Sequence, residues 1–246
     1  MESWQKIIKL SEIDSTNTYL SNLSKEAALA EGTIVAASYQ NVGKGYGTNL
    51  WESEKGKNIL ISILLFPSFL PVEKNFLLSK AVSLGILNYV ASKSNGIKIK
   101  WPNDIYYKEQ KLAGILIENI VKGDKLNQSI VGIGLNINQK TFLSNAPNPV
   151  SLNKITRKLY PIDQEIIKLR TSIQFFYNKL KLGKYNEINS DYLKYLYRYN
   201  EVHIFKCDNK HFKAKITGIT EFGYLEILTE QNEKRAFDFK EIEFVI

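Results

Sequence analysis

The stretch Lys100-Trp101-Pro102-Asn103-Asp104 joins two segments that have the composition of β-strands. Pro102 has a fixed φ angle and no N–H to donate, so it suits a rigid corner between strands. Such a corner presents the polar pair Asn103 and Asp104. A strand-like run that begins with a lysine follows shortly afterwards: Lys111-Leu112-Ala113-Gly114-Ile115-Leu116-Ile117-Glu118.

Helical and strand patterns alternate on both sides of this corner. Ser15 to Asn17 supply N-cap chemistry for a first helix that ends at Gly32. Short connections after the corner predict antiparallel neighbours. The patterns predict strands at 33–39, 59–65, 97–101, 104–107, 112–121 and 129–138, an amphipathic helix at 76–94, and further helices at 164–182 and around 192–199. We therefore expect an α+β domain.

After Asn200 the residue pattern changes and predicts a series of short strands. The expected strands are 202–206, 212–217, 224–228, 235–239 and 243–246, which is typical of a small β-barrel. Phe205, Phe212, Phe237 and Phe239 recur at strand spacing and are predicted to form the core of that barrel. We place the boundary between a catalytic domain and the barrel so that the domains are 1–197 and 198–246.

Composition excludes several classes of function. One cysteine and two histidines among 246 residues leave no internal disulfide and no cysteine-rich metal cluster, so no metal ligands are assigned. The net charge of +8 comes from scattered lysines and four arginines, whereas base-reading surfaces prefer clustered arginines, so no DNA binding is expected. The longest apolar run, 59–66, is far shorter than the roughly 20 residues of a membrane span. Without a secretory signal pattern in 1–15, we expect a cytoplasmic protein that does not bind membranes.

Two glycine-rich segments are candidates for ligand binding. The loop Gly43-Lys44-Gly45-Tyr46-Gly47 follows a predicted strand, so its N–H groups and Lys44 can approach an anion. It matches neither the Walker A nor the dinucleotide pattern, and a flexible surface turn remains the alternative. The segment 132–138 carries glycines where a flat ligand or another backbone can pass close to a strand, and a strand bulge remains its alternative.

Taken together, these segments resemble the biotin protein ligases. The resemblance runs in order through Asp14-Ser15-Thr16-Asn17, Tyr39-Gln40, the Gly43 loop, Trp51-Glu52-Ser53, the 100–104 corner, the Lys111 run and the 132–138 strand. It covers the first 150 residues by motif and the rest by architecture. It implies a catalytic domain with a mixed β-sheet, related to the fold of class II aminoacyl-tRNA synthetases, followed by a small SH3-like barrel. Some members carry an N-terminal DNA-binding domain that represses transcription; this chain resembles the type without it, and we expect no repressor role.

The resemblance also implies a reaction. ATP, accompanied by Mg²⁺, activates the carboxylate of biotin as an adenylate, and a lysine of a biotin carboxyl carrier protein then takes the biotinyl group. By similarity, Lys111 and Asp104 are the catalytic residues, and Asn103, Gly114 and Asn136 contact the nucleotide. The residues that would hold biotin or close over it are Ser15, Thr16, Asn17, Gln40, Gly43, Lys44, Gly45, Tyr46 and Trp51.

The chain departs from the family pattern in the glycine loop. Many relatives have an arginine-rich loop where this chain has Lys44, Tyr46, Gly47 and Asn49, and lysine lacks the bidentate fork of arginine. Two rival functions stay open: a lipoate or octanoate ligase or transferase of the same fold, and a basic nucleic-acid-binding barrel. The sequence leaves open which carrier is modified, what the barrel contributes, and whether a free sheet edge supports a homodimer.

Overall fold

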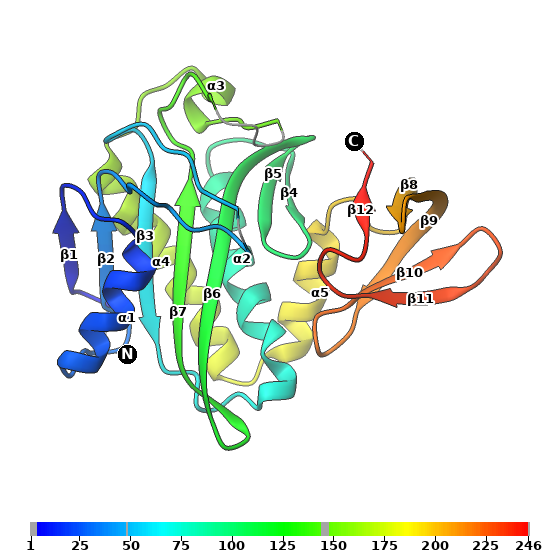
Figure 1. Ribbon diagram of the computed structural model, residues 1–246, viewed down its shortest axis with the longest axis horizontal. Coiled ribbons are helices and arrows are strands. Elements are labelled where there is room, and N and C mark those ends of the chain that lie inside the picture. Colours follow the sequence, from blue (N-terminus) through cyan, green and yellow to red (C-terminus); the bar gives the residue numbers. More distant parts are fainter. Residues whose placement is uncertain (1–3, 48, 144–147, 246) are drawn as a thin grey trace.

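The computed structural model describes residues 4–47, 49–143 and 148–245, which form two β-sheets and the helices that cover the larger one (Figure 1). The larger sheet has seven strands in the order β1-β2-β3-β7-β6-β5-β4. Only β1 and β2 pair in parallel; every other neighbouring pair is antiparallel. The sheet is therefore mixed, as the family resemblance implies. Its strands are β1 (Ile7–Leu10), β2 (Ile34–Ala37), β3 (Ile59–Leu65), β4 (Ile97–Lys100), β5 (Asp104–Tyr107), β6 (Gln110–Lys122) and β7 (Lys125–Leu135).

Three helices cover one face of this sheet: α2 (Phe76–Ala91), α4 (Ile162–Lys181) and α5 (Tyr185–Tyr195) (Figure 1). The prediction of an amphipathic helix at 76–94 is wrong in one respect. Twelve of the sixteen residues of α2 are buried, because α2 packs against β4 and β5 on one side and against α4 and α5 on the others. A helix enclosed in this way is apolar all round instead of along one stripe.

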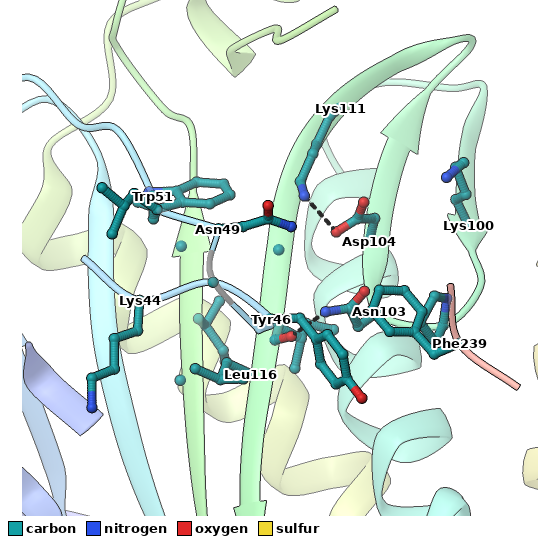
Figure 2. A pocket seen from close by; sticks show the side chains of 18 of the residues that line it. Lys44, Tyr46, Asn49, Trp51, Lys100, Asn103, Asp104, Lys111, Leu116 and Phe239 are labelled. Atoms are coloured by element: carbon teal, nitrogen blue, oxygen red, sulfur yellow. Dashed lines mark hydrogen bonds and ion pairs between the residues drawn. The ribbon is translucent and has the colours of Figure 1, made fainter. Parts of the chain in front are cut away.

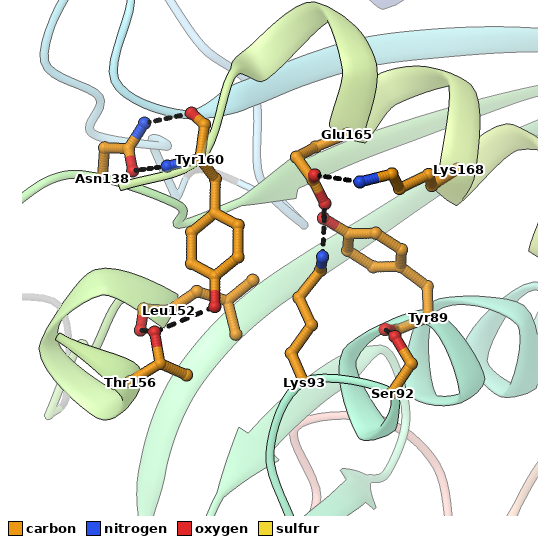
Figure 3. Close-up of polar contacts among 9 residues, drawn as sticks. All are labelled: Tyr89, Ser92, Lys93, Asn138, Leu152, Thr156, Tyr160, Glu165 and Lys168. Atoms are coloured by element: carbon orange, nitrogen blue, oxygen red, sulfur yellow. Dashed lines mark hydrogen bonds and ion pairs between the residues drawn. The ribbon is translucent and has the colours of Figure 1, made fainter. Parts of the chain in front are cut away.

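A buried carboxylate ties α2 to α4. Glu165 on α4 is 1% exposed and accepts hydrogen bonds from the Tyr89 hydroxyl at 2.6 Å and from Lys168 Nζ at 2.7 Å (Figure 3). Lys93 Nζ lies 2.6 Å from Oε2, the same carboxylate oxygen that Tyr89 contacts. Burial opposes ionisation of Glu165, but the hydrogen bonds from Lys168, Lys93 and Tyr89 outweigh it and lower the pKa of this carboxyl. The cluster fixes the helices that support the sheet from behind.

The opposite face of the sheet carries only part of a helical cover. Helix α1 (Thr16–Glu26) begins at Ser15, whose hydroxyl accepts from the N–H of Thr18, and packs on β2, β3 and β7. A small core of Leu20, Val35, Leu64 and Ile130 lies beneath it. The cavity described below lies on this face, beyond the N-terminus of α1. Two short helices complete the set: η1 (Val72–Lys74) and α3 (Leu152–Thr156).

The C-terminal strands form a separate antiparallel sheet in the order β11-β10-β9-β8-β12. The small β domain that the sequence predicts is confirmed in this form; the boundary at residue 198 stays a prediction, because one continuous hydrophobic core includes buried residues of both sheets. Helix α5 begins and ends earlier than the predicted stretch 192–199. The strands are β8 (Val202–Cys207), β9 (Lys210–Ile219), β10 (Leu225–Thr229), β11 (Lys234–Phe237) and β12 (Glu243–Phe244).

Side-chain and backbone contacts fix the second sheet against the first. Nε1 of Trp101, at the corner between β4 and β5, donates to the carbonyl of Gly223 at 2.8 Å. Gly223, which has φ +96°, approaches the ring of Phe76 so closely that a Cβ would lie 2.7 Å from it. The predicted corner residue Trp101 is therefore also a link between the two sheets. Among the described residues, no helix is long and apolar enough to cross a bilayer.

Candidate active site

A cavity of about 330 Å³ opens on the face of the sheet that α1 leaves uncovered. Its walls come from four places: the N-terminus of α1, the described residues of 40–51, strands β3 to β7, and the segment 239–244 that follows β11. The volume falls in the range of small-molecule sites. Of the residues predicted for the site, Ser15, Thr16, Asn17, Gln40, Lys44, Gly45, Tyr46, Trp51, Asn103, Asp104, Lys111 and Gly114 line it.

One end of the cavity is a set of neutral hydrogen-bonding groups around Thr16. Oε1 of Gln40 accepts from the Thr16 N–H at 2.8 Å and from its hydroxyl at 2.9 Å. Ser62 on β3 adds its hydroxyl, 2.7 Å from Oγ1 of Thr16, and also contacts Oδ1 of Asn17. Nδ2 of Asn17 donates to Glu118 at 2.7 Å, which ties the start of α1 to β6. This array can match fixed donors and acceptors of a neutral polar ligand.

The indole ring of Trp51 lies over the glycines of the central strands. A Cβ at Gly134 on β7 would overlap the ring, and a Cβ at Gly114 on β6 would lie 3.0 Å from it. A Cβ at Gly132 would overlap the side-chain amide of Asn17. The glycines of 132–138 predict that another group lies close to this strand, and this is so. The close groups are the side chains of Trp51 and Asn17, not a ligand or another backbone.

The other end of the cavity is charged. Nζ of Lys111 lies 2.8 Å from Oδ1 of Asp104, and 5.8 Å from the centre of the Trp51 ring (Figure 2). The side chains of Lys111 and Asp104 are 25% and 15% exposed, so solvent screens the pair only partly. The structure therefore brings the two predicted catalytic residues into direct contact beside the predicted aromatic wall.

A second lysine of this region, Lys100, received no role from the sequence. Its ammonium lies 4.6 Å from the ring centre of Phe244 and 5.3 Å from that of Tyr106. Burial lowers the pKa of Lys100, the nearby charges of Lys111 and Arg198 lower it further, and Asp104 opposes the shift. The position of Lys100 in the 100–104 motif is the one sequence signal for a role in the site. Its contact with Phe244 could not be predicted, because Phe244 lies near the far end of the chain.

The glycine loop forms one wall of the cavity. The N–H of Gly45 donates to the carbonyl of Asn49 at 2.8 Å, and the N–H of Trp51 donates to the carbonyl of Gly43 at 2.8 Å. Gly43 does not line the cavity; it fits beneath Trp51, whose carbonyl would lie 2.7 Å from a Cβ there. Tyr46 packs edge-on against Phe239 of the second sheet, with ring centres 4.1 Å apart. Phe239, which the sequence assigns to the barrel core, is only partly buried against that core and also lines the cavity.

The two asparagines predicted to contact a nucleotide use their amides within the protein. Nδ2 of Asn103 donates to the carbonyl of Ile115 at 2.8 Å, which closes the corner against β6, while Asn103 still lines the cavity. Asn136 is 3% exposed and is not among the lining residues. Its Nδ2 donates to the carbonyl of Val150 at 3.1 Å, so it holds the segment that follows β7.

Carboxylates are scarce around the cavity. Asp104 is the one carboxylate among the described lining residues, and the described chain contains no group of three or more His, Cys, Asp or Glu placed to hold a metal ion. These residues do not form a protein cage for Mg²⁺, which binds in many phosphate-transfer sites through substrate phosphates, water and one or two carboxylates. Asp104 is the carboxylate available for such a contact.

Comparison with known proteins identifies the family. The sequence profile of the Biotin/lipoate A/B protein ligase family matches residues 10–136, which is more than half of the chain and includes all the segments around the cavity that come from the first sheet. The chain belongs to this family. The match includes Ser15, Gln40, Asp104 and Lys111, and it ends before the second sheet.

Relatives named as ligases come from bacteria and from Homo sapiens. The bifunctional ligase/repressor BirA of Bacillus spizizenii is 34% identical over 139 residues, 56% of this chain and 42% of BirA. The biotin–protein ligase of Homo sapiens is 27% identical over 93% of this chain and 33% of its own length. The chain thus spans less than half the length of these relatives. The biotin protein ligase of Aquifex aeolicus, solved in complex with biotin and ATP, superposes with a TM-score of 0.80 at 26% identity and covers 97% of this chain and 98% of its own.

Proposed function

We propose that this chain is an ATP-dependent biotin protein ligase. It activates biotin as biotinyl-5′-AMP and transfers the biotinyl group to a lysine of a biotin carboxyl carrier protein. The observation that carries the proposal is the arrangement of one cavity, with neutral hydrogen-bonding groups at Thr16 and Gln40 and the Lys111–Asp104 pair at the opposite end. A ring-bearing acid fits such a cavity with its ring at the neutral end and its carboxylate at Lys111.

Four lines of support converge on biotin as the acid. The urea-like ring of biotin has two N–H donors and a carbonyl acceptor, which the hydroxyls of Ser15 and Thr16 and the amide of Gln40 can match. The flat face of Trp51 supplies an apolar wall beside them. The family match covers these residues, and the Aquifex aeolicus relative binds biotin together with ATP.

In the first step, a carboxylate oxygen of biotin attacks the α-phosphorus of ATP and pyrophosphate leaves. Negative charge accumulates around the reacting phosphate, and the ammonium of Lys111 stabilises it. In the second step, the amine of the carrier lysine attacks the acyl carbonyl, and AMP leaves with the electrons of the broken C–O bond. Asp104, which lies beside Lys111, would orient that amine and take up the proton that it loses as the amide forms. No nucleophile of the protein is needed, and Cys207 lies in β8 on the second sheet.

The glycine loop would close over the adenylate. Tyr46 and Trp51 both line the cavity, and the loop lies beside it as a hairpin closed by backbone hydrogen bonds such as Trp51 N–H to the carbonyl of Gly43. Closing would exclude water, which otherwise hydrolyses an acyl-adenylate. Magnesium would accompany the nucleotide phosphates.

A transfer assay tests the proposal directly. The purified protein is mixed with ATP, biotin and a biotin carboxyl carrier domain, and the intact mass of the carrier is measured. We expect one biotinyl group per carrier, dependent on ATP, and no product with a carrier whose target lysine is replaced by arginine. A carrier of unchanged mass, with the same preparation folded and binding neither ligand by calorimetry, would contradict the proposal.

The same assay separates the rival acid. The family also contains lipoate ligases, and lipoate lacks the ring N–H groups that the Thr16–Gln40 end would bind. Lipoate and octanoate, each tested in place of biotin with a lipoyl carrier domain, should therefore be poor substrates.

A further inference from the structure

The glycine loop holds one cation, and that cation faces away from the reacting groups. Lys44 is exposed, and Figure 2 shows its side chain extending away from Lys111 and Asp104. Tyr46, between Gly45 and Gly47, brings an aromatic ring instead of a charge. The loop itself therefore offers little positive charge to the distal phosphates of a nucleotide.

A cation from the second sheet occupies the space beside this loop. Nζ of Lys240 lies 5.7 Å from the ring centre of Tyr46, and a Cβ at Gly47 would lie 2.7 Å from the same nitrogen. Phe239 fixes the approach through its edge-on contact with Tyr46 and a second contact with Trp101, whose ring centre is 6.2 Å away. Gly47 has φ +65°, so both backbone and space favour glycine at this point.

The turn that carries Lys240 is held in place from both sides. The N–H of Asp238 donates to Glu241 at 2.7 Å, and the N–H of Glu241 donates to the carbonyl of Asp238 at 3.2 Å. Ile242, two residues after the lysine, is 5% exposed. Lys240 itself has φ +72°, and it lines the cavity together with Phe239.

Lys240 has no acidic partner in residues 4–47, 49–143 and 148–245: none of the ion pairs there includes it. Lys111, by contrast, is paired with Asp104, and Lys100 is enclosed by two aromatic rings. Lys240 is thus a positively charged residue of the cavity wall whose described contact is the aromatic ring of the exposed Tyr46. A charge-assisted hydrogen bond to a phosphate is stronger than such a contact.

We propose that Lys240, which follows β11 of the second sheet, binds the β- and γ-phosphates of the nucleotide. Its ammonium supplies the positive charge that the glycine loop of the first sheet lacks. The inference rests on the proposed function. Tyr46 and Phe239 are positioning residues in this arrangement: their contact holds the Lys240 turn against the loop. Lys111 acts at the α-phosphate, and Lys240 acts on the phosphates that depart as pyrophosphate.

Direct binding measurements test the role of Lys240. The variants are Lys240→Met, Lys240→Arg and, as a matched control, Lys234→Met, which removes an exposed lysine of β11 that does not line the cavity. Calorimetry is run with a non-hydrolysable ATP analogue, with AMP, and with biotin. We expect K240M to weaken binding of the triphosphate analogue by about tenfold, the loss expected for one charge-assisted hydrogen bond. AMP and biotin should bind K240M as they bind the wild-type protein, and K240R should retain binding of the analogue.

The outcomes separate this inference from the function on which it rests. If the wild-type protein binds biotin and the analogue, and K240M binds the analogue as tightly as K234M does, Lys240 does not hold the phosphates and the inference is wrong. A parallel loss of AMP and biotin affinity in K240M would also overturn it, because it would indicate general damage to the cavity. If the wild-type protein binds neither biotin nor the analogue, the proposed function fails as well.

Discussion

Lys111 and Asp104 meet because a bulge changes the register between β5 and β6. Asp104 lies opposite Gly114, whereas Tyr106 lies opposite Lys111, and the register shifts between Ile105 and Tyr106. Side chains alternate along a regular strand, so Lys111 and Gly114 would otherwise face opposite sides of the sheet. The extra residue on β6 turns both toward the cavity. The bulge thus places the ammonium of Lys111, the carboxylate of Asp104, and Gly114 on the same face of the sheet, with Gly114 lying beneath Trp51.

Replacing Lys111 by alanine should slow adenylate formation. The loss of one positioned cation in the transition state amounts to about 3 kcal/mol, which corresponds to a rate lower by two orders of magnitude or more. Biotin-dependent exchange of labelled pyrophosphate into ATP measures this step. Lys122→Ala, at the exposed end of the same strand, is the control and should keep the wild-type rate. A normal exchange rate in K111A would remove Lys111 from the catalytic residues.

Alanine at Gly114 or Gly134 should damage the proposed biotin site, and the damage should be larger where the added methyl group overlaps the Trp51 ring more. A methyl group at Gly134 overlaps the indole ring, while one at Gly114 lies 3.0 Å from it and requires a small shift. We expect G134A to weaken biotin binding more than tenfold and G114A to weaken it less, since displacement of a packed ring typically requires about 1–3 kcal/mol. Calorimetry gives the affinities, and tryptophan fluorescence reports the displacement of the ring. Equal affinities in both variants would contradict the close packing of Trp51 on β7.

Removal of the Glu165 carboxylate should destabilise the fold without a specific effect on the site. Glu165→Ala leaves Lys93 and the Tyr89 hydroxyl without their buried partner, and breaking such a cluster lowers the free energy of unfolding by about 3–5 kcal/mol. Urea unfolding followed by circular dichroism measures the change. Glu187→Ala, which removes an exposed carboxylate paired with Lys184 and Lys179, should change stability far less, because solvent screens that pair. Similar losses in the two variants would show that burial of Glu165 is unimportant.

Lys80 should make stability depend on pH above neutrality. This lysine of α2 is 5% exposed, and burial lowers its pKa to about 8, against the opposing effect of Glu221 and Glu226. Between pH 8 and the ordinary lysine value near 10.4, the unfolded chain binds a proton that the folded chain has released, so stability rises with pH by up to about 1.4 kcal/mol per unit. Below pH 8 both states are protonated, and the folded state carries the full cost of the buried charge.

The variant Lys80→Met removes this dependence. The unfolding free energy of Lys80→Met minus that of the wild-type protein should therefore decrease as the pH rises from 7.5 to 9.5. Urea titrations at three pH values measure it, and the exposed Lys25→Met serves as the comparison with a flat difference. A flat difference for Lys80→Met would mean that Lys80 titrates at its ordinary pKa in the folded protein.

The parts of the fold that depend on local sequence could be predicted. Strands β3 and β5 have the bounds that the sequence predicts, because continuous β-branched and apolar runs end at prolines or at polar turns. The five-residue helix α3 was missed, since its length gives no helical period to detect, although Ser151 caps it. Helix α5 was placed too late because Tyr197 and Tyr199 continue an apolar pattern that the left-handed Arg198 and Asn200 interrupt.

The residues of the candidate site also fall into those that could be predicted and those that could not. Its first-sheet residues lie in short motifs, so the resemblance to the ligase family points to Thr16, Gln40, Asp104 and Lys111 as candidates. The contributions of Phe239, Lys240 and Phe244 could not be predicted, because they depend on how the second sheet docks through contacts such as Trp101 to Gly223. A phenylalanine at strand spacing has the same local pattern whether it faces its own sheet or a neighbouring cavity.

The wall that residues 239–244 contribute to the cavity has a consequence for the order of events during synthesis. Ser15, Asp104 and Lys111 leave the ribosome long before Phe239 does, so the nascent chain carries its reactive pair for more than a hundred residues without the last wall of the chamber. For the proposed ligase, residues 239–244 would be the last part of the cavity wall to be synthesised, so containment of an acyl-adenylate would require the second sheet.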